Sequence, residues 1–173
     1  MSQNTPFREL ILLRHAKSSW ENDAANDFAR PLNRRGERDA PRIGNWLRDQ
    51  GFYPDLILAS PAERAKQTIL AVSEAMEGKP EQIVWERGIY EANISTLLEV
   101  IRGISDDARR VLLVGHNPGL ESLALYLIGP GAELEYGFMK TATVVRIAMP
   151  SHWIDVGQNS GKLLQVMQPR ELA

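Results

Sequence analysis

The sequence predicts a three-layer α/β/α sandwich with a mostly parallel central sheet, formed as one domain over residues 1–173. Three apolar runs of four residues each indicate the strands, at positions 10–13, 56–59 and 111–114. Such runs are too short for a buried helix and fit strands that are covered on both faces. Helical stretches separate them, and this alternation favours right-handed crossovers within about one domain length of chain.

Four helices are predicted from their start and stop signals, over about residues 34–50, 62–76, 95–103 and 119–128. In the first, Asn33 is placed as the N-cap and Gly51 as the stop. Pro41 lies inside this helix and should kink it or divide it in two. Pro61 and Pro118 precede the second and the fourth helix, where a missing backbone N–H is tolerated.

Three further strands are expected. Residues 83–85 fit a short strand, and the β-like runs at 142–148 and 163–167 are separated by a loop that contains glycine. We interpret these last two runs as strands at the sheet edge that pair antiparallel with each other.

The composition excludes several classes of protein. Lys plus Arg total 20 and Asp plus Glu total 22, which gives a net charge of −2, so no general attraction for nucleic acid or anionic lipid is expected. Cysteine is absent, which removes thiolate nucleophiles and agrees with a reducing compartment. The N-terminal region has four consecutive apolar residues before Arg14, too few for a signal or a membrane span, so we predict a cytoplasmic protein.

Positively charged and imidazole side chains follow the three apolar runs directly. Arg14-His15 follows the first, Ser60-Pro-x-x-Arg64 the second, and Gly-His116-Asn-Pro-Gly the third. Ligands of open parallel sheets bind beyond the carboxyl ends of the strands, so we expect these side chains to converge. Two of the loops also open helices, whose first N–H groups attract anions. The sequence therefore predicts a phosphate-binding pocket.

These residue types also suggest a reaction. Arg14 and Arg64 suit a phosphoryl clamp because guanidinium groups bind two oxygens and stay charged. Nearby guanidinium groups should lower the pKa of His15, so that its neutral ring attacks phosphorus, while His116 donates to the phosphoryl oxygens. The scheme requires no metal, and the chain has no HExxH, GxxxxGK[ST] or GxSxG motif.

Taken together, the three motifs resemble the histidine phosphatase superfamily, which includes the cofactor-dependent phosphoglycerate mutases. The similarity spans about residues 10–127, and the Arg-His-Ala-Lys-Ser-Ser-Trp stretch with Pro-Leu-Asn-x-x-Gly36 resembles the small SixA-type phosphohistidine phosphatases. The resemblance implies a phosphoglycerate mutase-like fold, phosphorylation of His15, and a phosphate pocket formed by Arg14, Arg64 and His116. It also implies that no cofactor is needed.

Other residues of the site are less strongly indicated. Glu91 is the available general acid, although an exposed glutamate ahead of a helix is an equal alternative. Ser18 and Asn117 are further candidates for substrate binding. Ala16 replaces a glycine that many family members have, and Glu21, with Asn22 beside it, stands where mutases usually have asparagine. We leave Glu21 and Asn22 out of the site because a glutamate there would repel an anion.

Several conspicuous residues also have ordinary structural explanations. His152 is expected in a loop, and Trp20 either lines the pocket or packs in the core. Four arginines have helical spacing and indicate a solvated face, or a surface that guides a phosphorylated protein: Arg34, Arg35, Arg38 and Arg42.

We therefore expect a metal-independent phosphatase of the histidine acid type, hydrolysing phosphohistidine in proteins or small phosphorylated compounds. A phosphate-binding module without turnover is the alternative, and a small phosphoester phosphatase or mutase remains a further one. The expected partner is a phosphorylated protein or small molecule, with neither nucleic acid nor membrane. The oligomeric state is left open.

Overall fold

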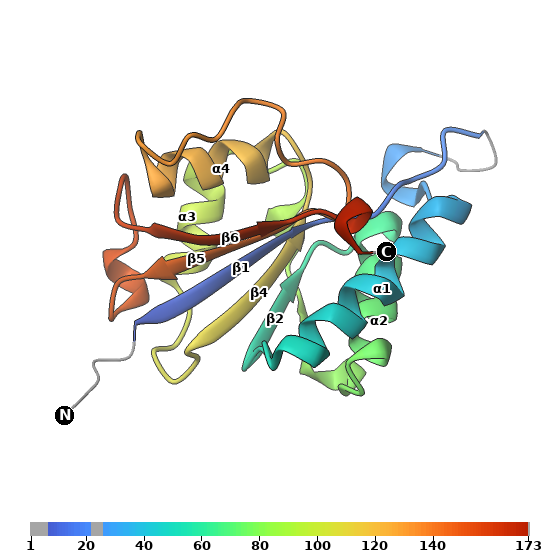
Figure 1. Cartoon of the computed structure of the whole chain (residues 1–173), viewed down its shortest axis with the longest axis horizontal. Coiled ribbons are helices and arrows are strands. Elements are labelled where there is room, and N and C mark those ends of the chain that lie inside the picture. The colour runs from blue at the N-terminus through green and yellow to red at the C-terminus, as the bar shows by residue number, and fades with distance from the viewer. Residues whose placement is uncertain (1–6, 22–25, 173) are drawn as a thin grey trace.

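The computed structural model describes residues 7–21 and 26–172 and shows a sheet between two pairs of helices (Figure 1). The strands within these residues are β1 Arg8–Arg14, β2 Leu56–Ala59, β3 Ile83–Trp85, β4 Arg110–Gly115, β5 Val144–Met149 and β6 Lys162–Met167. The α-helices there are α1 Arg34–Gln50, α2 Glu63–Ala75, α3 Ile94–Arg102 and α4 Gly119–Ile128. Helices α1 and α2 cover one face of the sheet, and α3 and α4 cover the other. The predicted α/β sandwich is confirmed.

The sheet has six strands in the order β3-β2-β4-β1-β5-β6. Its first four members are mutually parallel, whereas β5 runs antiparallel to β1 and β6 antiparallel to β5. The predicted pairing of the last two strands is therefore correct, but β5 is not an edge strand. Val144 packs in the hydrophobic layer of α1 and α2, whereas Val145 and Ile147 pack in that of α3 and α4, so β5 is covered on both faces as well as paired at both edges.

Side chains of β1 alternate between the two hydrophobic layers. Leu10 and Leu12 pack in the layer that holds α3 and α4, while Ile11 and Leu13 pack in the layer of α1 and α2. Each buried side chain of this size stabilises the fold by about 1.5–3 kcal/mol. Burial on both faces also sets the register of the strand, so the position of its carboxyl end is well determined.

Helix α1 begins and ends as predicted but is not divided. The side chain of Asn33 accepts a hydrogen bond from the first turn, and Gly51 ends the helix with φ of 76°. The helix continues through Pro41, so the predicted division is wrong. Proline removes one backbone hydrogen bond. Burial of Ile43 and Leu47 against α2 keeps the two halves in one helix.

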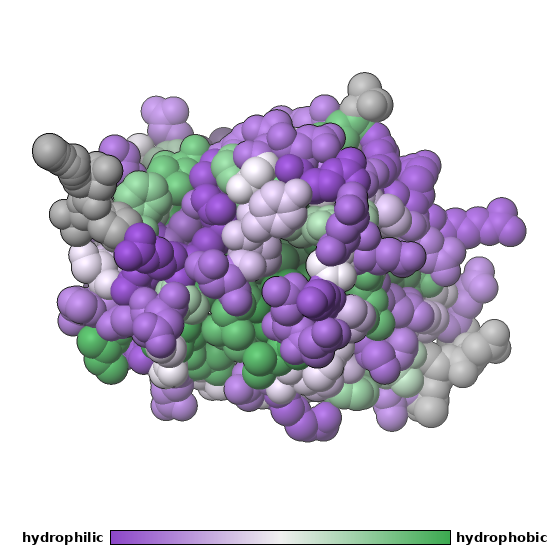
Figure 2. Space-filling view, turned by 90° about the horizontal axis from the view of Figure 1, so that it is seen from below, coloured by the Kyte–Doolittle hydropathy of each residue, from purple (hydrophilic) through white to green (hydrophobic). Residues whose placement is uncertain are grey.

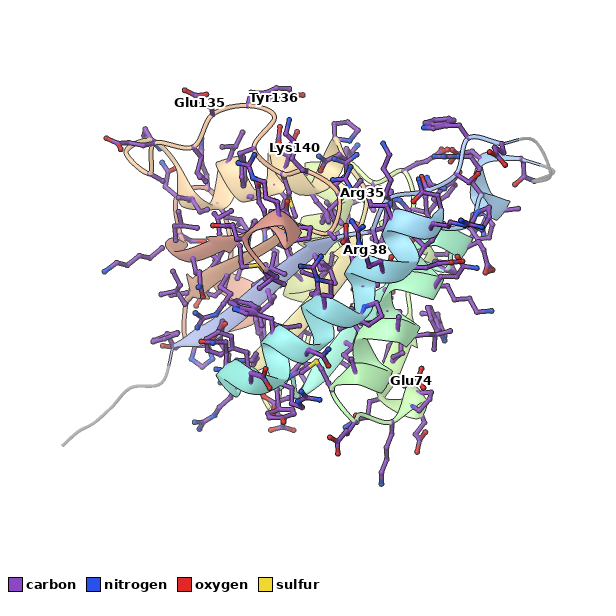
Figure 3. The ribbon with its side chains drawn as sticks, turned by 45° about the vertical axis from the view of Figure 1, so that its right-hand side comes forward. Arg35, Arg38, Glu74, Glu135, Tyr136 and Lys140 are labelled. Carbon is purple, nitrogen blue, oxygen red and sulfur yellow. The ribbon has the colours of Figure 1, made fainter. Side chains whose placement is uncertain are left out.

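The predicted basic face of α1 is organised around one carboxylate. Arg35, Arg38 and Arg42 lie 3.5–3.6 Å from the carboxylate of Asp39, which is 4% exposed. Figure 3 shows Arg35 and Arg38 on the outer side of the helix, in agreement with a solvated face. His152 lies in a loop, as predicted, and its Nδ1 is 2.8 Å from Asp106 Oδ2.

Hydrophilic side chains cover most of the face shown in Figure 2, with one hydrophobic area near its middle. Among the described residues, no helix is both long and apolar enough to span a bilayer.

Candidate active site

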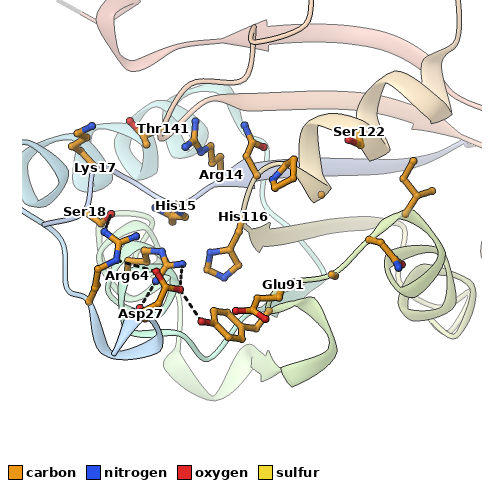
Figure 4. A pocket seen from close by; sticks show the side chains of 18 of the residues that line it. Arg14, His15, Lys17, Ser18, Asp27, Arg64, Glu91, His116, Ser122 and Thr141 are labelled. Atoms are coloured by element: carbon orange, nitrogen blue, oxygen red, sulfur yellow. Dashed lines mark hydrogen bonds and ion pairs between the residues drawn. The ribbon is translucent and has the colours of Figure 1, made fainter. Parts of the chain in front are cut away.

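The carboxyl ends of β1, β2 and β4 open into a cavity of about 930 Å³ (Figure 4). All the side chains that the sequence indicated lie on its wall: Arg14, His15, Ser18, Arg64, Glu91, His116 and Asn117. The parallel pairing of β1 and β2 with β4 brings residues from three distant segments together.

His15 is buried at the end of β1 with its tautomer set by a backbone contact. Its Nδ1 lies 2.7 Å from the carbonyl oxygen of Ala16, which only accepts, so Nδ1 carries the proton. In the neutral ring Nε2 is then unprotonated. Burial, more than the nearby His116 and arginines, lowers the pKa of His15 to about 3. The pKa of His15 is shifted in the predicted direction, although the main cause is desolvation rather than the guanidinium groups.

His116 stands beside His15 and bonds to Ser60. The two imidazole rings have centroids 5.2 Å apart, and His116 Nε2 lies 2.7 Å from Ser60 Oγ. Ser60 Oγ already accepts from the N–H of Ala62, so we assign its proton to the bond with His116. The imidazole proton then lies on Nδ1, which has no partner among the described residues. Burial is the main cause that lowers the pKa of His116 to about 4.

Ser60 is a site residue to which the motif alone assigned no role. It is fully buried immediately after β2, and its hydroxyl links the start of α2 to the His116 ring. The signal in the sequence that could have indicated a role for Ser60 was its position directly after the second apolar run.

Asp27 engages Arg64 and was not predicted. Arg64 Nη1 donates to the Asp27 carbonyl oxygen at 2.7 Å, and Nη2 donates to its carboxylate at 3.0 Å. The hydroxyl of Tyr90 donates to the same carboxylate at 2.7 Å, and this bond is the main cause that lowers the pKa of Asp27 to about 2. In turn, burial and then the Asp27 contact raise the pKa of Tyr90 to about 12. No motif marked Asp27, because it lies 37 residues before Arg64.

Arg30 joins this cluster to the loop that follows His15. Its Nη1 donates to Ser18 Oγ at 3.0 Å and to the Ser19 carbonyl at 2.9 Å, and its Nε lies 3.1 Å from Asp27. The guanidinium also stacks 3.7 Å from the ring centroid of Trp20. Trp20 is 74% exposed and lines the cavity, so the predicted alternative in which it packs in the core is wrong. The hydroxyl of Ser18 is engaged by Arg30.

Arg14 and Asn117, which both line the cavity, donate to one shared acceptor. Arg14 Nη1 and Asn117 Nδ2 both donate to the carbonyl oxygen of Met139, at 3.0 and 2.9 Å. Burial lowers the pKa of Arg14 from its ordinary value, and the charge of Glu121 opposes this shift.

Glu91 is exposed on the cavity wall and has a φ of 57°, next to Tyr90. Glu21 instead lines a separate hollow with Arg34 and Arg35, in agreement with its omission from the site. Asn22 lies outside the described residues.

Two motif glycines allow close approach of backbone segments at the site. A Cβ at Gly36 would overlap the carbonyl oxygen of Lys17 in the loop after His15. A Cβ at Gly119 would overlap the carbonyl oxygen of Ala92. Glycine at these positions therefore lets the starts of α1 and α4 pack directly against the loops of the cavity.

Within the part of the chain that the structure describes, no three His, Cys, Asp or Glu side chains form a cluster suited to a metal ion.

Comparison with known proteins identifies the family. Residues 10–97 match the model of the histidine phosphatase superfamily, branch 1, and the chain belongs to this superfamily. Its membership and its structural similarities support a phosphatase.

Two relatives of equal identity differ in how much of their length the match covers. An uncharacterized protein of Mycobacterium tuberculosis is 32% identical over 164 residues, which cover 91% of this chain and 100% of that protein. An uncharacterized chloroplastic protein of Arabidopsis thaliana is 32% identical over 136 residues, or 74% of this chain, and the match spans 62% of its length.

Among solved structures, a candidate phosphohistidine phosphatase SixA from Agrobacterium tumefaciens has a TM-score of 0.80 and 32% identity. That alignment covers 96% of this chain and 100% of the other. A protein histidine phosphatase SixA in complex with tungstate has a TM-score of 0.80 at 20% identity, with 95% of this chain and 99% of the other covered, and shares the fold.

Proposed function

We propose that this protein is a metal-independent phosphatase of the histidine acid type, which hydrolyses phosphohistidine in proteins or small phosphorylated compounds through a phosphohistidine on His15. The observation that carries the proposal is the state of the His15 ring. Its Nδ1 proton is held by the Ala16 carbonyl and its pKa is about 3, so Nε2 has a free electron pair at neutral pH. A neutral imidazole in a cationic pocket is suited to attack on phosphorus.

In the first step, His15 Nε2 forms a bond to phosphorus while the bond from phosphorus to the leaving group breaks. The ring becomes cationic, and the Ala16 carbonyl stabilises its Nδ1 proton. Arg14 and Arg64 hold the phosphoryl oxygens, and His116, whose ring stands beside His15, is the further donor. Ser18 and Asn117 line the cavity and remain our candidates for substrate binding, and their polar groups also bond to Arg30 and Met139.

In the second step, a water oxygen attacks phosphorus and the bond to Nε2 breaks, which returns the electron pair to the ring and releases phosphate. We assign Glu91 to protonate the leaving group and then to receive the water proton, because its carboxyl lies on the cavity wall. A leaving imidazole departs more easily than an alkoxide, so the need for this acid should depend on the substrate.

The relatives support the class of substrate. The Agrobacterium tumefaciens structure is described as a phosphohistidine phosphatase candidate, and the similarity extends over its whole length. The absence of cysteine from this chain agrees with a cytoplasmic location, which we include in the proposal.

The test is mass-spectrometric trapping of the phosphoryl group after rapid mixing with para-nitrophenyl phosphate, without added metal. Label is expected on His15, and His15→Ala should abolish both label and turnover. Label on another residue, or turnover by the variant, would contradict the mechanism. Glu91→Gln should slow hydrolysis of the phosphoester more than that of a phosphoramidate, and equal, negligible losses would remove Glu91 from the mechanism.

The same experiment separates the alternatives. A binding module would take up phosphate and give neither label nor turnover, on para-nitrophenyl phosphate or on a phosphohistidine protein. A mutase would transfer the phosphoryl group to a second hydroxyl compound rather than to water. The match to a Streptomyces avermitilis phosphoglycerate mutase spans 30% of that protein, so it carries less support than the full-length similarities.

A further inference from the structure

Glu121 is a buried carboxylate that the proposed reaction does not use. It is the third residue of α4 and is 3% exposed. One carboxylate oxygen accepts from the backbone N–H of Gly137 at 2.7 Å, and the other accepts from that of Met139 at 2.8 Å. Among the described residues no cation lies within 4.0 Å of it.

A buried carboxylate without an ion pair is unfavourable unless hydrogen bonds replace its hydration. Here two backbone N–H groups do so, and the first turn of α4 adds its partial positive charge. The carboxylate therefore holds residues 137–139 against the start of the helix. Figure 3 shows the surrounding segment, with Glu135, Tyr136 and Lys140, as a loop that passes over this end of the molecule.

The segment that Glu121 holds is also the segment that holds Arg14. The carbonyl oxygen of Met139 accepts from Arg14 Nη1 at 3.0 Å and from Asn117 Nδ2 at 2.9 Å. Asn117 Oδ1 in turn accepts from the backbone N–H of Glu121 at 3.2 Å. Glu121, Asn117 and the 137–139 segment thus form a closed set of hydrogen bonds, and through the Met139 carbonyl this set reaches the Arg14 guanidinium on the cavity wall.

We propose that Glu121 is a positioning residue, which acts through the Met139 carbonyl to hold the Arg14 guanidinium in the geometry that binds the phosphoryl group. The inference rests on the proposed function, because it assigns Arg14 to phosphate binding. The charge of Glu121 also favours the charged form of Arg14, against its burial. A residue that serves only to anchor the loop would alter stability without acting on Arg14.

A double-mutant cycle separates these two roles. Glu121→Gln keeps the shape of the side chain but offers an NH₂ group where one backbone N–H needs an acceptor. We expect it to weaken orthovanadate binding about tenfold and to raise KM for para-nitrophenyl phosphate more than it lowers kcat. In the Arg14→Lys background the same substitution should have little further effect, because lysine lacks the planar fork that the carbonyl orients.

Glu37→Gln is the matched control, since Glu37 lies in the first turn of α1 and is exposed. It should leave vanadate affinity unchanged. Gly137→Ala perturbs the same segment through its backbone. Gly137 has a φ of 93°, which strains alanine, and an added Cβ meets nothing within 4 Å, so the substitution introduces no clash. It should weaken vanadate binding and be non-additive with Arg14→Lys, and it decides the question if Glu121→Gln does not fold.

The outcomes distinguish this inference from the function on which it rests. If the wild-type chain neither binds vanadate nor turns over phosphoester, both proposals fail. If the wild-type chain binds and reacts, but the effects of Glu121→Gln and Arg14→Lys simply add, or Glu121→Gln leaves affinity unchanged, only the role of Glu121 is refuted.

Discussion

Asp27→Asn should tighten the binding of phosphate to the cavity. Both Nη groups of Arg64 donate to Asp27, one to the backbone carbonyl at 2.7 Å and the other to the carboxylate at 3.0 Å. A phosphate that binds this guanidinium has to replace at least one of these contacts. Asp27 is therefore an internal competitor for the group that we assign to the phosphoryl clamp.

The size of the effect follows from the charges. A phosphate on the same guanidinium would lie about 6 Å from the carboxylate, where unit charges repel by about 0.7 kcal/mol in water and about 3 kcal/mol at an effective dielectric of 20. The Asp27 side chain is 48% exposed, so screening favours the lower part of this range. We expect a gain of about 1–2 kcal/mol, or about a 5- to 30-fold lower Kd.

Isothermal titration with orthovanadate and with inorganic phosphate measures the change. Asp49→Asn is the matched control, because its carboxylate also pairs with an arginine, Arg48 at 3.2 Å, on the exposed end of α1. It should have no effect on either ligand. Unchanged or weaker binding by Asp27→Asn would refute the competition and would show that Asp27 serves instead to orient Arg64.

Three further predictions follow from the same geometry. His15 and His116 have pKa values of about 3 and 4 in the fold and about 6.5 when unfolded, so the unfolded chain binds more protons between these limits. The free energy of unfolding, measured with urea, should thus fall as the pH drops below about 6.5, by up to about 1.4 kcal/mol per pH unit for each histidine, and a flat profile would contradict their burial as neutral rings. Ser60→Ala should lower kcat about tenfold with little change in KM, as judged by steady-state kinetics, because His116 loses the hydroxyl that sets its tautomer; an unchanged kcat would remove Ser60 from the reaction. Gly36→Ala should destabilise the fold by at least about 2 kcal/mol through the clash with a backbone carbonyl, whereas Gly103→Ala, where φ is −84° and the added Cβ makes ordinary contacts, should be nearly neutral in the same urea titration.

Local patterns in the chain were sufficient to predict the layers of the fold. The apolar runs of β1, β2 and β4, the Asn33 cap and the Gly51 stop act within a few residues of one another, so their signal is visible in the sequence. The division of α1 at Pro41 was wrongly predicted, because the rule for proline does not include the tertiary packing of α1 on α2. The place of β5 was misjudged for a similar reason, since its neighbours depend on how the whole sheet is assembled.

The sequence by itself also determined which side chains converge, because parallel strands end at the same edge and the site side chains lie at the end of a strand or shortly after it: Arg14, His15, Arg64 and His116. Only the tertiary structure showed what holds these groups. Asp27 reaches Arg64 across 37 residues, and the Met139 carbonyl reaches Arg14 across 125. Such contacts join single loop residues that have no periodic pattern and no fixed spacing, so they become visible only when packing brings distant loops together.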